Sequence, residues 1–182
     1  VGNFMGDFVK GSQFEAYSEM VAKGIILHRE IDTYTDNHSI VSLSKDKLRA
    51  KYRHYSGVIV DMYYDHFLAT KFEHYASQSL KDFAQENYRI LENHIDILPP
   101  RAQYILLYMI KGDWLTHYAK KEGIHRSLTG MARRTKFDSK LELAIQDLSE
   151  HYHSFESEFT EFFDDIQQHI SQYRQELINS KS

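Results

Sequence analysis

Cysteine is absent from this 182-residue sequence, and proline and glycine are scarce. Without cysteine the chain can form no disulfide, no thiolate nucleophile and no Cys-ligated metal site, so a bound metal must be held by His, Asp, Glu or carbonyl oxygens. Only two prolines, adjacent at positions 99–100, and eight glycines interrupt the chain, and no strand-like alternation is sustained. These absences predict an all-α protein.

Long apolar runs are also missing. No window reaches the roughly 20 apolar residues that a membrane-spanning helix needs, and no basic-then-apolar signal pattern opens the chain. The net charge of −4 and the lack of a recognised motif argue against nucleic-acid binding. We therefore predict a soluble, cytoplasmic protein that binds neither membrane nor nucleic acid. Because the sequence begins at Val1 rather than Met, we expect that an N-terminal stretch is missing before it.

A chain of 182 residues with 42% apolar residues can build one folded core, so residues 1–182 are predicted to form a single domain. Its helices, about seven in number, are predicted at residues 14–36, 40–53, 55–75, 79–96, 100–120, 122–134 and 138–178. An apolar stripe at steps of three and four runs along the last of these. This long C-terminal helix would span roughly 60 Å, more than the width of a small domain. Its tail is therefore expected either to project from the domain or to pack on a second subunit, forming a homodimer.

Polar residues interrupt the apolar face of two predicted helices. His28 and Asp32 are four residues apart, so they lie on one helix face, close enough to share a metal or a hydrogen bond. Asp61 and Asp65 repeat this spacing, and two carboxylates on a half-buried face repel each other unless a cation or a shared proton lies between them. One imidazole with three carboxylates suits Mn²⁺, Fe²⁺ or Mg²⁺.

Asp7 is a further candidate ligand, because the glycines around it give its turn the freedom to approach the site. Ordinary structural roles compete with each assignment. A helical His on an apolar face is usually a satisfied core residue, an Asp pair is usually solvated, and Asp7 would serve as a helix cap. His66 lies about 100° around its helix from Asp65 and can point elsewhere.

Five segments, in order along nearly the whole chain, resemble the acyl carrier protein phosphodiesterases. They are Gly2-Asn3 to Asp7-Phe8, His28-Arg29-x-Ile31-Asp32 followed by Thr35-Asp36-Asn37, Asp61-x-x-x-Asp65-His66-Phe67-Leu68, Trp114-Leu115, and Gly130-Met131-Ala132-Arg133-Arg134. The resemblance implies an HD-like helical bundle that depends on a divalent cation, typically Mn²⁺. It also implies hydrolysis of the phosphodiester that joins 4′-phosphopantetheine to a serine of acyl carrier protein.

The sequence departs from the pattern of this family in two places. In the usual dyad of HD-type phosphohydrolases His precedes Asp, whereas here Asp65 precedes His66, so the ligand of this pair is not fixed by the resemblance. The family also normally begins with an apolar, His-containing stretch before the Gly2-Asn3 turn. If a histidine of that stretch is a ligand, this chain alone would bind metal weakly or be inactive.

The resemblance suggests roles for the remaining candidates. Asp65 or His66 would position the attacking water or move its proton. Arg133 and Arg134 are the first choice, and Arg29 the second, for stabilising the negative charge on the phosphoryl oxygens; the competing role of all three is ordinary surface charge. Trp114 would shelter the pantetheine arm, although a single Trp on a helix stripe is more often part of the core.

Positive charge is concentrated in two stretches of this acidic chain. Residues 45–53 carry a net charge of +4 and residues 120–136 a net charge of +5, counted from the sequence. Such stretches are usually solvated helix faces, but they would also suit docking of acyl carrier protein, which is strongly acidic.

Two other functions fit the same residues. The metal site could serve a nucleotide or another small phosphoester, although the chain lacks a phosphate-cradling glycine-rich loop. Alternatively, the chain could be a non-catalytic helical interaction module that works through its long C-terminal helix. That last hypothesis predicts no specific metal binding.

Overall fold

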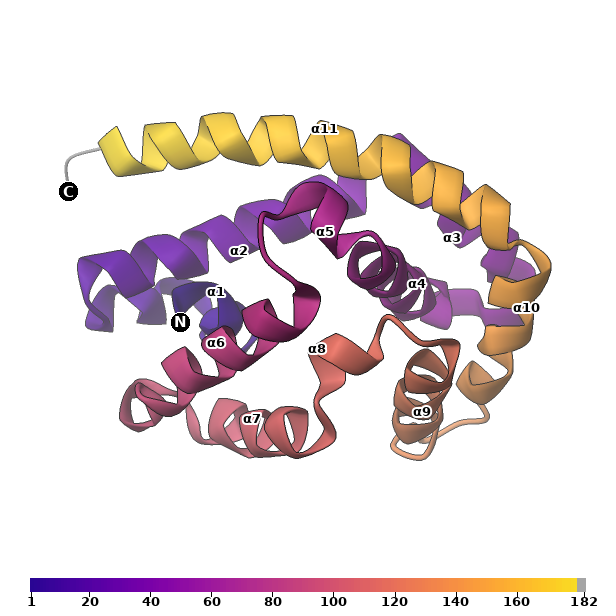
Figure 1. The fold of residues 1–182 in the computed structure, drawn as a ribbon, viewed down its shortest axis with the longest axis horizontal. Helices are drawn as coiled ribbons and strands as arrows, with labels where there is room; N and C mark the ends of the chain where they lie inside the picture. The colour runs from indigo at the N-terminus through magenta and orange to yellow at the C-terminus, as the bar shows by residue number, and fades with distance from the viewer. Residues whose placement is uncertain (180–182) are drawn as a thin grey trace. The chain divides into compact units, whose positions relative to one another are not determined.

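The computed structural model describes residues 1–179 and shows helices joined by short turns, with no strand in that range (Figure 1). The predicted all-α class is therefore confirmed. The α-helices are α1 (Gly2–Met5), α2 (Glu19–Asn37), α3 (Ser39–Tyr52), α4 (Ser56–Thr70), α5 (Phe72–Tyr75), α6 (Leu80–Glu92), α7 (Pro100–Gly112), α8 (Trp114–His117), α9 (Lys121–Ala132), α10 (Ala144–Glu150) and α11 (Tyr152–Asn179). Short 3₁₀ helices lie at Gly6–Phe8, Gly11–Ala16, Arg53–Tyr55, Ile95–Ile97 and Leu141–Leu143. None of the described helices is long and apolar enough to cross a bilayer.

Several predicted helices are broken or shortened in the structure. The predicted helix 14–36 is divided at Tyr17, which is extended between the 3₁₀ helix Gly11–Ala16 and α2, and the predicted helix 79–96 ends at Glu92. The predicted helix 100–120 ends at Gly112, because Asp113 adopts a left-handed conformation with φ 42° and ψ 54°. The predicted helix 55–75 is interrupted at Lys71. The predicted helix 138–178 is divided at His151 into α10 and α11. The long C-terminal helix is real, but its 28 residues span about 42 Å rather than 60 Å.

The described chain forms two compact units, each built from separate segments. The first unit contains residues 1–37, 85–111 and the part of α11 from Phe163 onward, and the second contains residues 38–84 and 112–162. α11 thus contributes its beginning to the second unit and its remainder to the first. The single domain remains a prediction.

The core of the first unit lies where α1, α2, α6 and α7 meet. Its buried members are Met5, Val9, Ile25, Leu91, Leu98, Ala102 and Leu106. The C-terminal part of α11 runs beside α2 (Figure 1), where His169 Nε2 lies 2.7 Å from Glu30 Oε1 and its ring stacks on Tyr34 with centroids 4.3 Å apart. Residues near the two ends of the sequence therefore build one unit.

The core of the second unit is rich in aromatic side chains around α4. Tyr63 and Phe67 are fully buried and contact the rings of Phe155 and Phe159 at centroid distances of 5.0 and 5.8 Å. The Tyr63 hydroxyl donates a hydrogen bond to the carbonyl oxygen of Ala144 in α10. α4 is therefore fixed against both α10 and α11, and most of its surface is core.

Candidate metal centre

Two close backbone approaches seat the N-terminal turn against α2. A Cβ atom added to Gly2 would lie 2.9 Å from the Cα of Gly24, and one added to Gly6 would lie 1.9 Å from the ring of His28. Real Cβ atoms do not approach other atoms this closely, so both positions require glycine. The turn can therefore lie flat on α2, which brings the next residue, Asp7, beside His28.

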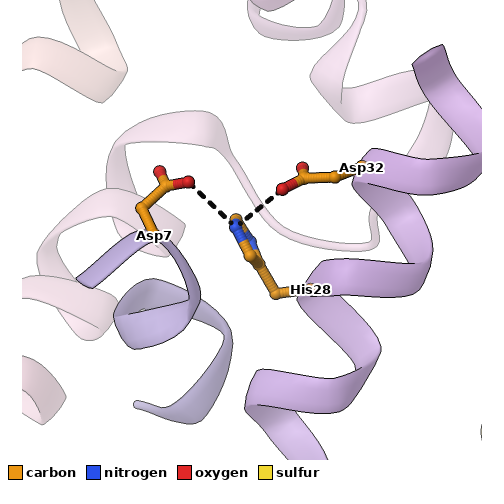
Figure 2. Close-up of side chains that lie close together, drawn as sticks. All are labelled: Asp7, His28 and Asp32. Carbon is orange, nitrogen blue, oxygen red and sulfur yellow. Dashed lines mark hydrogen bonds and ion pairs between the residues drawn. The ribbon is translucent and has the colours of Figure 1, made fainter. Parts of the chain in front are cut away.

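Asp7, His28 and Asp32 form a compact cluster in the first unit. Figure 2 shows both carboxylates directed at the same ring nitrogen: His28 Nε2 lies 3.3 Å from Asp7 Oδ1 and 3.1 Å from Asp32 Oδ2. The imidazole is 17% exposed, whereas the side chains of Asp7 and Asp32 are 72% and 56% exposed. The cluster therefore has a buried anchor and an open side that a cation or a substrate can reach.

The charges of these three groups are coupled. A hydrogen bond to Asp7 raises the pKa of His28, and burial of the ring partly opposes that rise. The same hydrogen bond lowers the pKa of Asp7, whereas burial, followed in smaller part by the negative charge of Asp7, raises the pKa of Asp32. Asp32 is the nearer carboxylate, but Nε2 carries at most one hydrogen, so the two oxygens compete for it.

This donor set fits a divalent cation. One ligand atom from each residue lies within 4.8 Å of the other two, and two carboxylates with one imidazole are ligands suited to Mn²⁺, Fe²⁺ or Mg²⁺. The negative charge of Asp7 and Asp32 can be offset either by a proton on His28 Nε2 or by a bound cation. Binding of a cation must displace that proton, so affinity should fall as the pH falls.

Arg29 holds the N-terminal turn in the structure, and its predicted contact with substrate remains a prediction. Its Nη2 donates a hydrogen bond of 2.8 Å to the carbonyl oxygen of Val9, and its guanidinium lies 5.2 Å from the ring centroid of Phe14. The guanidinium therefore binds the segment that carries Asp7 to α2.

The other two predicted ligands, Asp61 and Asp65, lie on α4 of the second unit, and both are exposed. The structure thus gathers three of the five predicted ligands into one cluster, and the contribution of Asp61 and Asp65 remains a prediction. The Asp65 carboxyl reaches solvent but is crowded by protein atoms, and this loss of hydration, together with the charge of Asp61, raises its pKa to about 7. Asp65 is therefore poised to exchange a proton near neutral pH.

His66 is buried, with only 2% of its surface exposed. Its Nδ1 lies 2.8 Å from the Tyr118 carbonyl oxygen, so Nδ1 carries the hydrogen, and its Nε2 lies 3.1 Å from the Tyr152 hydroxyl. Burial lowers the pKa of His66, which keeps the ring neutral. Both nitrogens are occupied by these contacts, so of the predicted catalytic pair Asp65 is the better placed to handle water.

The remaining predicted residues also belong to the second unit. Trp114 and Arg134 line one pocket of about 230 Å³ at α8 and α9, and Arg133 caps the end of α9. Both arginines are exposed. The Arg134 Nε donates a hydrogen bond of 3.1 Å to the Gly130 carbonyl oxygen.

One basic residue near the cluster was missed by sequence reasoning. The positive charge of Arg101, near the start of α7, contributes to lowering the pKa of Asp7. No motif marks Arg101 in the sequence, because its position depends on how α7 packs within the first unit. The glycines at positions 2 and 6 were the available signal for the close contact with α2, since their spacing of four residues aligns them on one side of a helical turn.

In this all-α chain, one His and two Asp side chains converge from a glycine-flanked turn and a helix. The chain is therefore a helical protein with a candidate divalent-cation site. Residues 1–166 match the family model described as acyl carrier protein phosphodiesterase. The chain therefore belongs to the acyl carrier protein phosphodiesterase family, and the resemblance carried by its motifs is confirmed.

Curated relatives named acyl carrier protein phosphodiesterase agree with this assignment. The chain is 32% identical to that of Photorhabdus laumondii over 164 residues, which cover 90% of this chain and 83% of the relative. It is 31% identical to that of Serratia proteamaculans, covering 92% and 88% of the two chains, and 35% identical to that of Enterobacter sp. strain 638, covering 89% and 84%. No solved structure matches the chain.

Proposed function

We propose that this protein hydrolyses the phosphodiester of holo-acyl carrier protein, releasing 4′-phosphopantetheine and apo-acyl carrier protein, with a divalent cation at Asp7, His28 and Asp32. The observation that carries the proposal is the convergence of two carboxylates on His28 Nε2 in a member of a family whose relatives bear this activity in their name. We place the reaction in the cytoplasm. The homodimer through α11 remains a prediction.

The cation would be Mn²⁺, with Mg²⁺ or Fe²⁺ as alternatives, and when bound it supplies polarisation of a phosphoryl oxygen and acidification of water. The residues of the first unit hold it: His28 as a neutral nitrogen donor, and Asp7 and Asp32 as charged oxygen donors. Arg101, whose charge reaches Asp7, would add positive charge for a phosphate.

The reaction adds water across one P–O bond. The water oxygen bonds to phosphorus, the bond from phosphorus to the serine oxygen breaks, and the serine oxygen takes up a proton. A group with a pKa near neutrality can accept the proton of water and return it, and the pKa of Asp65 is about 7. Participation of Asp65, Arg133 and Arg134 in this step remains a prediction.

Mass spectrometry of holo-acyl carrier protein incubated with the protein and Mn²⁺ tests this proposal. We expect loss of the phosphopantetheine mass from the carrier, and no loss when a chelator is present. Asp32→Asn should reduce the rate at least about 100-fold, beyond the 10–100-fold typical of changes around metal ligands. Asp164→Asn, an exposed change on α11, is the matched control and should keep the full rate.

A parallel panel of nucleotides and a chromogenic phosphodiester separates the alternatives. Metal-dependent hydrolysis of these compounds with an unchanged carrier would replace the carrier reaction by that of a small phosphoester. Absence of every hydrolysis and of cation binding would leave the chain as a helical interaction module.

A further inference from the structure

The pocket at α8 and α9 combines apolar walls with positive charge. It has a volume of about 230 Å³ and lies entirely within the second unit. Among its lining residues are Trp114, Tyr118, Met131, Arg126 and Arg134. Both arginines are exposed. A pocket of this kind is large enough for one apolar side chain and presents guanidinium groups to whatever surrounds that side chain.

Gly130 forms an open position on α9 between Arg126 and Arg134. Arg126 and Gly130 are four residues apart on one face of α9. Arg134 lies in the turn just after α9 and is held beside them by the hydrogen bond from its Nε to the Gly130 carbonyl oxygen. A Cβ atom added to Gly130 would meet no atom within 4 Å, and Gly130 is not in a left-handed conformation. Glycine weakens a helix interior, and nothing inside the chain requires it at this position. A partner that approaches the α9 backbone closely would require glycine at this position.

The other two glycines that line this pocket, Gly112 and Gly123, are required by close contacts within the chain. A Cβ atom on Gly123 would lie 2.0 Å from the His117 carbonyl oxygen, and one on Gly112 would lie 2.6 Å from the indole Nε1 of Trp114. The left-handed Asp113 lies between Gly112 and Trp114. Close contacts and an uncommon backbone conformation therefore position the Trp114 indole in the pocket. At Gly130, by contrast, no other atom of the chain covers the helix backbone.

The two basic stretches of the sequence also differ in the structure. In residues 45–53, Lys47 pairs with Glu158, and Lys51 Nζ lies 2.7 Å from Asp147 Oδ2, so much of this charge is neutralised within the second unit. In contrast, Arg126 makes no ion pair with any residue that the structure describes, and neither does Arg134. Arg126 and Arg134 therefore offer a partner positive charge that no described carboxylate neutralises.

We propose that this α9 face, defined by Arg126, Gly130, Met131, Arg134 and the adjoining Trp114, docks an acidic helix of the carrier protein. The proposal rests on the proposed function. The acidic side chains would lie against the guanidiniums, the backbones would approach across Gly130, and an apolar side chain would enter the pocket beside Trp114.

Binding can be measured without hydrolysis, because Trp114 is the sole tryptophan of the chain and lines the pocket. Apo-acyl carrier protein lacking tryptophan is titrated into the protein while the Trp114 fluorescence is recorded. Arg126→Gln and Gly130→Leu should each weaken binding about tenfold or more, and binding should weaken further as salt is added. Arg89→Gln, the same change of charge on α6, should leave binding unaltered.

Gly130→Leu also separates docking from folding. Leucine is a better helix former than glycine, so the variant should melt at a higher temperature than the wild type while binding the carrier more weakly. Gly130→Ala should melt higher too, with a smaller loss of affinity. Weaker binding by a more stable protein cannot be explained by a damaged fold.

Kinetics distinguish this proposal from the proposed function. With holo-acyl carrier protein, Arg126→Gln should raise KM about tenfold with kcat within about twofold, and hydrolysis of a chromogenic phosphodiester should not change. Loss of hydrolysis in the wild type with carrier binding intact would overturn the function and keep the docking. Unaltered carrier binding in both Arg126→Gln and Gly130→Leu would overturn the docking, as would a Trp114 response to RNA or anionic vesicles in place of the carrier.

Discussion

α2 and α4 each present two polar side chains four residues apart, yet the two helices use that spacing differently. On α2, His28 and Asp32 are joined by Asp7 from a separate turn, and one nitrogen faces two carboxylates. On α4, the second group is another carboxylate, and the pKa of Asp65 rises to about 7. Helical spacing decides which side chains share a face, whereas the charge of each group depends on what lies opposite it.

The largest expected effect comes from removing the shared nitrogen on α2. His28→Gln leaves two carboxylates without the imidazole between them, and we expect the affinity for Mn²⁺ to fall at least about 100-fold. Isothermal titration calorimetry measures this change, with Asp164→Asn as the control. An unchanged affinity would mean that Asp7, His28 and Asp32 form an ordinary surface ion pair.

Substitution of Gly6 should also disrupt the cluster of Asp7, His28 and Asp32, because Gly6 lies against the His28 ring. In Gly6→Ala the added Cβ would lie 1.9 Å from the His28 ring, so the ring must move, and we expect a loss of about 1–3 kcal/mol in the free energy of unfolding together with weaker Mn²⁺ binding. Urea denaturation and a metal titration measure the two effects.

Gly57→Ala on α4 is the matched control for that substitution. Its added Cβ would come no closer than 3.8 Å to another side chain, so the better helix former should raise the free energy of unfolding by about 0.5–1 kcal/mol. Equal effects of the two alanines would show that Gly6 does not support His28.

On α4, substitutions of the adjacent residues Asp65 and His66 should have different effects, because Asp65 is exposed and His66 is buried. His66→Leu leaves the Tyr118 carbonyl and the Tyr152 hydroxyl without this partner, so it should lower the free energy of unfolding by about 1–3 kcal/mol and leave the Mn²⁺ affinity unchanged. Burial lowers the pKa of His66, so below its ordinary value of 6.5 the unfolded chain binds more protons than the folded chain. The wild type therefore loses stability as the pH falls through 6.5, and the leucine variant lacks this loss. A difference that stays constant between pH 8 and pH 5 would contradict the assignment.

The effect on stability has the opposite sign for Asp65→Asn, which should stabilise the folded protein above neutral pH. The folded pKa of Asp65, about 7, lies above the ordinary value of 3.8 for this group, so its carboxyl disfavours the folded state increasingly as the pH rises from 3.8 through 7. The variant should match the wild-type melting temperature at pH 3.5 and exceed it at pH 8. If Asp65 is a metal ligand, added Mn²⁺ should stabilise the wild type at pH 8 and reverse the difference.

Periodicity predicted α3, α6 and α9 to within a few residues, because buried residues recur at steps of three and four along each of them. It did not predict the divisions at Asp113 and His151. At His151 the apolar spacing continues from Leu148 to Phe155, both fully buried, so the pattern is the same for a straight helix and a broken one. Such breaks depend on tertiary packing, which local spacing does not contain.

In the candidate site, too, local spacing predicted the neighbours along the chain but not the contacts that depend on tertiary packing. The sequence predicted the neighbours His28 and Asp32 from helical spacing, and Asp7 from the glycines beside it. It did not predict that both nitrogens of His66 would be occupied, since Tyr118 and Tyr152 are 52 and 86 residues away in the sequence. Nor did it predict the part of Arg29 in holding the N-terminal turn, because the acceptor is a backbone carbonyl and leaves no mark in residue type.

The alternation of segments between the two units sets an order of events during synthesis. Residues 38–162 separate the N-terminal segment of the first unit from the part of α11 that runs beside α2. At about 5–20 residues per second, these 125 residues take about 6–25 s to translate. The second unit is complete once Phe162 has emerged, whereas the unit with the candidate metal centre must wait for the end of α11. The ribosome thus delivers Asp7, His28 and Asp32 among the first residues, and the helix that completes their unit among the last.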